Sequence, residues 1–70
     1  MANIINQIRR LRFEHGEMTQ QALAELAGVT RQTIIAIEGG KYSPSLELAF
    51  RLARAFNVAI DDVFRWKETP

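Results

Sequence analysis

The 70-residue sequence contains no cysteine. Disulfide bonds, thiolate metal sites and cysteine nucleophiles are therefore excluded, and this composition is compatible with a reducing cytosol. The single histidine, His15, has no second histidine or cysteine with which to share a metal, so we expect an ordinary surface residue. No nucleophile with its base, no ligand cluster and no phosphate loop is recognisable. The sequence therefore predicts a protein that is not an enzyme and that uses no metal, cofactor or small-molecule ligand.

An excess of one charge and long apolar runs are missing as well. Nine Lys and Arg residues against eight Asp and Glu give a formal net charge of +1, so the overall charge does not by itself indicate a nucleic-acid partner. No run approaches the length of a membrane span, and the first residues lack the apolar core of a signal peptide. We expect one domain, residues 1–70, in the cytoplasm and away from membranes.

Turn and capping residues divide the chain into five predicted helices, and no segment alternates with the period of two that is typical of a strand. Thr19 and Thr30 are predicted N-caps, and each follows an apolar residue placed to form a hydrophobic staple. Ser45 is favoured over Ser43 as the N-cap of the next helix. The expected fold class is all-α, with helices at residues 4–14, 20–27, 31–38, 46–56 and 60–65.

The second and third predicted helices form a candidate helix-turn-helix at residues 20–39. Ala24 is small where the two helices must approach each other closely, and Gly28 permits the positive φ that the turn between them requires. Apolar side chains at helical spacing would hold the crossing. Each of these residues alone is more often an ordinary core residue, but their joint occurrence in one short window favours the motif. The outer face of the third helix is then Arg31, Gln32, Ile35 and Ala36.

Three segments carry a family resemblance: TQQALAELAGVTRQTI, IEGGKYSPSLE and FNVAIDDVF. They resemble the phage repressor and Cro-like helix-turn-helix family, also called the Xre family, over nearly the whole chain. The resemblance implies a compact five-helix, lambda-repressor-like DNA-binding domain. It further implies a transcriptional regulator, commonly a repressor or autoregulator, that binds double-stranded DNA as a homodimer on a palindromic operator. The helix at residues 31–38 would then lie in the major groove.

The same resemblance assigns roles to individual residues. Base edges would be read by Arg31, Gln32, Ile35 and Ala36, and their chemistry agrees: arginine can bind guanine, glutamine can bind adenine, and small apolar groups can contact a thymine methyl. The sugar-phosphate backbone would be contacted by Gln20, Thr30, Thr33, Gly39, Gly40 and Lys41, with the glycines acting through their amides. Arg12 and Glu38 would form a structural ion pair. Arg9 and Arg10 have two alternative interpretations of equal weight: they contact a phosphate, or they belong to a solvated helix face.

The C-terminal third of the sequence offers more apolar side chains than a core of this size can bury. Leu46 and Phe50 lie at one edge of a wide apolar arc, and the short segment after the fourth helix adds three more. Exposed apolar clusters usually mark an interface, so the predicted dimer interface is Leu46, Phe50, Val63, Phe64 and Trp66. The alternative is that Phe64 closes the core and Trp66 caps its rim.

A second function remains open, that of a protein-binding module such as an antitoxin or adaptor with the same fold. A protein-binding face would be expected to carry aromatic anchors. The exposed positions of the motif carry Gln20, Arg31 and Gln32 instead, which can donate and accept hydrogen bonds. The sequence therefore favours DNA binding.

Overall fold

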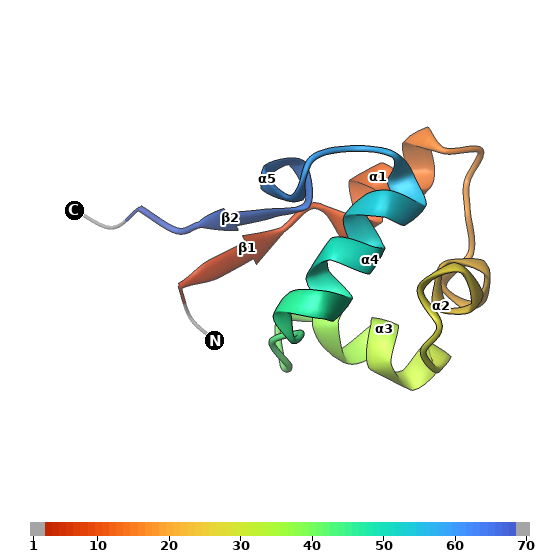
Figure 1. Cartoon of the computed structure of the whole chain (residues 1–70), viewed down its shortest axis with the longest axis horizontal. Coiled ribbons are helices and arrows are strands. Elements are labelled where there is room, and N and C mark those ends of the chain that lie inside the picture. Colours follow the sequence, from red (N-terminus) through yellow and green to blue (C-terminus); the bar gives the residue numbers. More distant parts are fainter. Residues whose placement is uncertain (1–2, 69–70) are drawn as a thin grey trace.

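The computed structural model describes residues 3–68, and within this range it consists of five helices and one two-stranded antiparallel sheet. Figure 1 shows the two strands as a ribbon that projects from one side of the helices, while α2 and α3 lie toward the other side. None of the helices in this range has the length and apolar character needed to cross a membrane. The order of elements is β1 (Ile4–Asn6), α1 (Ile8–Glu14), α2 (Gln20–Ala27), α3 (Arg31–Glu38), α4 (Leu46–Phe56), α5 (Ile60–Val63) and β2 (Phe64–Trp66).

Helix α4 supplies the largest share of the core, as its wide apolar arc predicts. Its apolar residues are buried along most of its length, and side chains from the other four helices surround them. Burying each large side chain stabilises the fold by roughly 1.5–3 kcal/mol. The largest fully buried side chains are Ile8, Leu23, Ile34, Ile37, Leu52, Phe56 and Val63.

The helix starts follow from the capping residues in the sequence. The hydroxyl of Thr19 accepts the backbone N–H of Ala22 at 2.9 Å, and the hydroxyl of Thr30 accepts that of Thr33 at 3.2 Å. Ser45 caps α4 in the same way, as expected. Helices α2, α3 and α4 accordingly have the predicted bounds.

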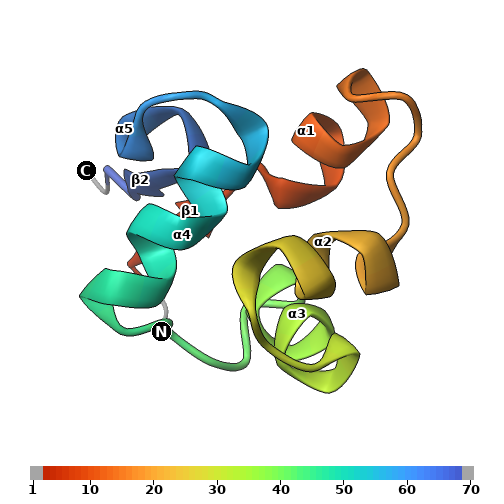
Figure 2. The same ribbon diagram turned by 45° about the vertical axis from the view of Figure 1, so that its right-hand side comes forward.

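The turn between α2 and α3 has the predicted geometry. Gly28 adopts a left-handed conformation, with φ of 74°, which glycine reaches without a Cβ penalty. Ala24 is fully buried. These two small residues let α2 and α3 cross closely, and Figure 2 shows the two helices next to each other, below α1 and to the right of α4.

The two ends of the chain differ from the all-α prediction. The predicted helix at 4–14 is wrong in its first part, because Ile4–Asn6 is a strand, and the predicted helix at 60–65 ends early at Val63, because Phe64–Trp66 is its partner strand. Ile4 pairs with Trp66 in the antiparallel register. The fold is therefore a helical helix-turn-helix domain with a small sheet. The periodicity of the apolar residues is a local signal, whereas this sheet depends on a partner at the far end of the chain.

His15 is exposed, as expected for a surface residue, and its ring also contacts two helix ends. Its Nδ1 lies 2.8 Å from the carbonyl oxygen of Leu11 and its Nε2 lies 2.9 Å from that of Phe56. Its ring also packs against the Phe56 ring, with 5.3 Å between the centroids. The side chain thus connects the end of α1 to the end of α4.

Candidate nucleic-acid interface

Helix α3 turns one face into the core and the other to solvent. Ile34 and Ile37 are buried, whereas Arg31, Gln32 and Ile35 are exposed. Ala36, beside Ile35, is half-buried. The four residues predicted to read bases therefore lie on the outer side of α3, and three of them are exposed.

Glu38, the last residue of α3, is held by side chains from two other helices. Arg12 of α1 donates to its carboxylate through two nitrogens, at 2.8 and 3.0 Å, and Gln20 of α2 donates a third hydrogen bond at 3.0 Å. The Arg12 and Glu38 side chains are only 17% and 13% exposed. The predicted ion pair is thus present, and it fixes the C-terminal end of α3 against α1 and α2.

The same contact orients the Gln20 side chain. Its side-chain nitrogen donates one N–H to Glu38 and keeps a second N–H that a phosphate could accept. The backbone amides of Gln20 and Gln21, in the first turn of α2, have no hydrogen-bond partner within residues 3–68. Such amides suit an anion. The backbone amides of α2 and the second N–H of the Gln20 side chain are therefore the donors available to a phosphate.

A polar hollow lies where α1, α2 and α3 meet. Its lining distinguishes Arg9 from Arg10, for which the sequence allowed either a phosphate contact or a solvated helix face. Arg9 lines this hollow together with Gln20, Gln21 and Arg31. Arg10 instead bonds to Glu14 at 3.1 Å, within its own helix. Arg9 and Arg31 have no ion-pair partner among the described residues. Arg10 and Glu14 are four residues apart, a spacing that favours an ion pair within one helix. This signal in the sequence could have predicted that Arg10 is paired within its helix and Arg9 is not.

The end of α3 corrects one expectation about phosphate contacts. The amide of Gly39 donates to the carbonyl of Ile35 and the amide of Gly40 to that of Ile37, both at 3.0 Å. These amides are therefore used inside the chain and are not free donors for DNA. Lys41, which follows them, is exposed and has no ion-pair partner in the described part of the chain.

The two threonines of α3 are also partly engaged. The hydroxyls of Thr30 and Thr33 lie 3.1 Å apart and share a hydrogen bond. Thr30 is exposed and Thr33 is half-buried. Thr30 caps the helix, since its hydroxyl accepts the backbone N–H of Thr33, and as the exposed residue it is the better placed of the two for a contact with the DNA backbone.

Comparison with known proteins identifies the family. A helix-turn-helix family model, HTH_3, matches residues 8–63. The chain belongs to the helix-turn-helix family of transcriptional regulators. It is 51% identical over 63 residues to an HTH-type transcriptional regulator of Methanocaldococcus jannaschii, covering 90% of this chain and 94% of that protein. It is 36% identical over 64 residues to the cryptic phage CTXphi transcriptional repressor RstR of Vibrio cholerae, covering 91% of this chain and 57% of the repressor.

A solved structure supports the same assignment. The restriction-modification controller protein C.AhdI from Aeromonas hydrophila superimposes with a TM-score of 0.73 at 31% identity, covering 79% of this chain and 82% of the other. The resemblance drawn from the sequence motifs is thus confirmed. The family model begins at Ile8 and ends at Val63, so both strands of the ribbon lie outside the matched residues.

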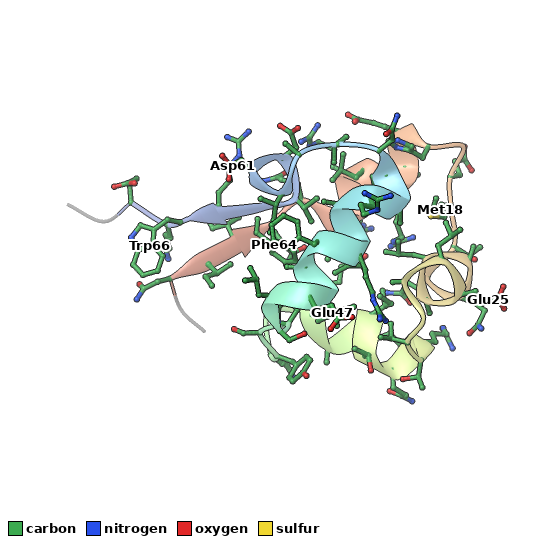
Figure 3. The ribbon with its side chains drawn as sticks, viewed as in Figure 1. Met18, Glu25, Glu47, Asp61, Phe64 and Trp66 are labelled. Carbon is green, nitrogen blue, oxygen red and sulfur yellow. The ribbon has the colours of Figure 1, made fainter. Side chains whose placement is uncertain are left out.

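The apolar side chains predicted to form a dimer interface divide into two groups. Leu46, Phe50 and Trp66 are 71%, 49% and 64% exposed. Val63 is fully buried, so its assignment to the interface is wrong, because α5 turns this side chain into the core. Phe64 is half-buried and packs against the core. Figure 3 shows Phe64 directed toward the helices and Trp66 out on the ribbon.

The structure adds one residue to the exposed group. Ile4 is 44% exposed and lies directly opposite Trp66 in the ribbon. It also lines a small cleft with Tyr42 and Pro44, in the loop that leads into α4, so the ribbon and the start of α4 are neighbours. The sequence prediction missed Ile4 because it assigned this residue to a helix. We call Ile4, Leu46, Phe50 and Trp66 the apolar end surface.

Proposed function

We propose that the protein is a repressor-type regulator that inserts α3 into the major groove of double-stranded DNA and reads a specific sequence. The observation that carries this proposal is that α3 is held rigidly by the rest of the fold while its outer face stays exposed. Its inner face is buried, its end is fixed by the Arg12–Glu38 ion pair, and its first turn carries the unpaired, exposed Arg31. A rigid helix that presents free hydrogen-bonding groups at its N-terminal end matches the needs of groove reading.

The chemistry of the outer face supports base recognition. Arg31 can bind guanine O6 and N7 with two hydrogen bonds, and Gln32 can bind adenine N6 and N7. One turn later, Ile35 and Ala36 supply apolar surface for a thymine methyl group. A single helix with so few reading groups covers only a short sequence.

The surroundings of α3 support contacts with the DNA backbone. Arg9 and Arg31 bring positive charge to the polar hollow, where Arg12 already balances Glu38. The free amides in the first turn of α2 point to the same role, and exposed Lys41 lies beyond the other end of α3. These groups flank the reading face, so they would position the protein on DNA without selecting a sequence.

A two-fold homodimer on a palindromic operator is part of the proposal. Two copies would place their recognition helices in successive major grooves about 34 Å apart, which doubles the sequence that is read. The apolar end surface is the proposed contact, because its four large side chains are exposed in the single chain. A cytoplasmic location is part of the same proposal, because the protein must reach its operator there.

Selection from random double-stranded DNA tests the proposal. The wild-type chain is expected to enrich one palindromic sequence. Arg31→Ala is expected to bind that sequence more weakly by about 1–3 kcal/mol and to lose preference at one base pair in each half-site. Arg54→Ala is the matched control, since it removes an exposed arginine from the last turn of α4. If Arg31→Ala keeps every base preference of the wild type, Arg31 does not read bases.

One observation favours the adaptor alternative. Phe13 of α1 is 72% exposed, and aromatic side chains anchor many protein interfaces. If the wild-type chain enriches no DNA sequence, protein binding through Phe13 becomes the favoured function. Loss of a purified protein partner on Phe13→Glu, with the fold intact, would then support the protein-binding function.

A further inference from the structure

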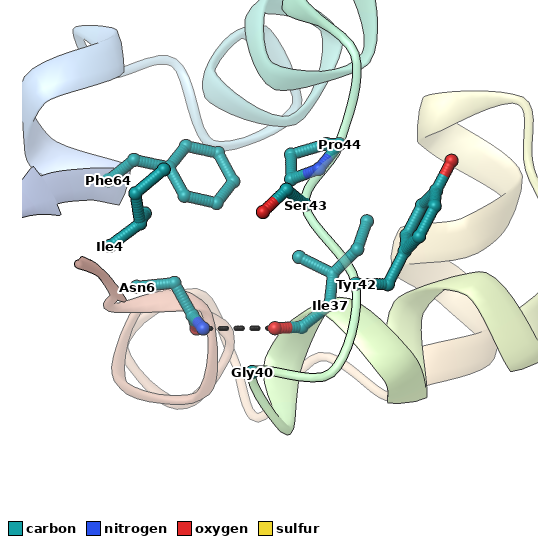
Figure 4. Close-up of a pocket in the computed structure, with 8 residues that line it drawn as sticks. All are labelled: Ile4, Asn6, Ile37, Gly40, Tyr42, Ser43, Pro44 and Phe64. Carbon is teal, nitrogen blue, oxygen red and sulfur yellow. Dashed lines mark hydrogen bonds between the residues drawn. The ribbon is translucent and has the colours of Figure 1, made fainter. Parts of the chain in front are cut away.

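Asn6, the last residue of β1, bonds to two helices at once. Its side-chain oxygen accepts the backbone N–H of Ile8 at 3.2 Å, where α1 begins. Its side-chain nitrogen donates to the carbonyl of Ile37 at 3.0 Å and, more weakly, to that of Glu38 at 3.4 Å. Figure 4 shows the bond to Ile37 crossing from β1 to α3.

The two carbonyls belong to the last turn of α3. Carbonyls in a final helical turn lack a donor from their own helix. The carbonyl of Ile37 already accepts the amide of Gly40, so Asn6 adds a second bond to it and ties this end of α3 to β1. Glu38 therefore receives bonds from three elements: its carboxylate is bound by Arg12 and Gln20, and its carbonyl by Asn6. Among the side-chain hydrogen bonds of residues 3–68, those from Asn6 connect α3 to the ribbon.

Asn6 lies in the same strand as a residue of the apolar end surface, so its bonds connect α3 to that surface. Side chains two residues apart in a strand point to the same face, so Asn6 and Ile4 share a face of β1, and their cross-strand partners are Phe64 and Trp66. One short strand thus contacts the reading helix at one end and carries part of the apolar end surface at the other. In a two-fold dimer, the separation of the two reading helices would depend on this strand in both copies.

We propose that Asn6 is a positioning residue that fixes α3 relative to the dimer surface, and thereby sets the half-site spacing that the protein accepts. This inference rests on the proposed function as a dimeric DNA-binding protein. Asn6 itself does not contact DNA. It acts through the end of α3, at the opposite end of the helix from Arg31.

Asn6→Asp separates the two bonds of this side chain. Aspartate can still accept the N–H of Ile8, but it cannot donate to the α3 carbonyls, and its charge is repelled by the negative end of the helix. Asn3→Asp is the matched control, because Asn3 is exposed, lies in the same segment and gains the same charge. Both variants and the wild type are compared on the selected palindrome and on versions with one base pair inserted or removed between half-sites.

The decisive quantity is the ratio of affinities for operators with different half-site spacings. The wild type and Asn3→Asp should lose affinity about tenfold or more when the spacing changes, since one base pair moves and rotates one half-site relative to the other. Asn6→Asp should bind the best spacing about tenfold more weakly, the effect of losing about one hydrogen bond in each copy. Its preference among spacings should shrink to about threefold or less, which a loss of stability alone would not produce.

Each remaining outcome counts for or against the proposal. Asn6→Asp with the spacing preference of the wild type overturns it. If Asn6→Asp does not fold, Asn6→Ser is tested, because the serine hydroxyl can still accept the N–H of Ile8 but is too short to reach α3. If Asn6→Ser does not fold either, Asn6 is a folding residue and the proposal is wrong. A wild-type chain that selects no DNA, or that ignores spacing, overturns the proposed function first, and the role of Asn6 falls with it.

Discussion

Helix α3 and the ribbon of β1 and β2 are both too short to be stable alone, and the molecule supports them differently. Helix α3 has a buried inner face, an N-cap, and side-chain bonds at its last residue from α1, α2 and β1. The ribbon has three residues in each strand, and Ile4 and Trp66 at its outer end remain exposed. The reading element is thus completed within one chain, whereas the ribbon leaves apolar surface that a second copy would cover.

The largest expected effect comes from breaking the support of α3. Glu38→Ala should lower the free energy of unfolding by about 3 kcal/mol, because it leaves the Arg12 guanidinium mostly buried without its partner. Urea unfolding measures this change. Glu47→Ala is the control, since it removes an exposed carboxylate that pairs with Arg51 within α4, and it should cost about 0.5 kcal/mol or less. Equal costs for the two variants would mean that the network does not hold α3.

The ribbon should respond in the opposite way. Trp66→Glu is expected to leave the free energy of unfolding of the single chain within about 0.5 kcal/mol of the wild type, because Trp66 is exposed. It should nevertheless abolish dimer formation at micromolar concentration, since it places a charge in an apolar contact. Sedimentation measures the association. Phe13→Glu introduces the same charge at an exposed aromatic residue of α1 and should remain dimeric. A dimeric Trp66→Glu would remove Trp66 from the interface.

The smallest expected effect compares one lysine from each region. Lys41→Ala, just after α3, should weaken binding about equally on all DNA sequences and reduce the salt dependence by about one phosphate contact. Lys67→Ala, just after β2, removes the same charge far from the reading face and should change neither quantity. Titrations at several salt concentrations measure both. A change of base preference in Lys41→Ala would contradict its assignment to the backbone.

The sequence predicts the helix-turn-helix much better than the ends of the chain. Thr19, Gly28 and Thr30 act on residues a few positions away, so their signals can be read directly and the structure agrees with them. Ile4 and Trp66 form strands only because they meet, and nothing near either residue indicates the other. Because the sheet is not predicted, Ile4 is absent from the predicted interface, whereas Val63 is assigned to it wrongly because α5 turns this side chain into the core.

For the candidate site, the sequence predicts the types of residue well and their partners less well. Arg31 and Gln32 are exposed as expected, because helical periodicity alone separates the two faces of α3. The use of the Gln20 side chain by Glu38, and of the glycine amides by α3, depends on distances between elements. Such competition between a ligand and the chain for the same donor is not visible in a linear pattern.

The pairing of β1 with β2 also affects the order in which the molecule is built. Helix α2 packs against α3, and α4 against α5, each its neighbour in sequence. The ribbon joins the two ends of the described chain, so its closure carries the larger entropic cost and is expected late in folding. During synthesis, α2 and α3 are complete long before Trp66 is added. A nascent chain would therefore form its recognition unit first, and the surface for pairing would be assembled only when translation has passed β2.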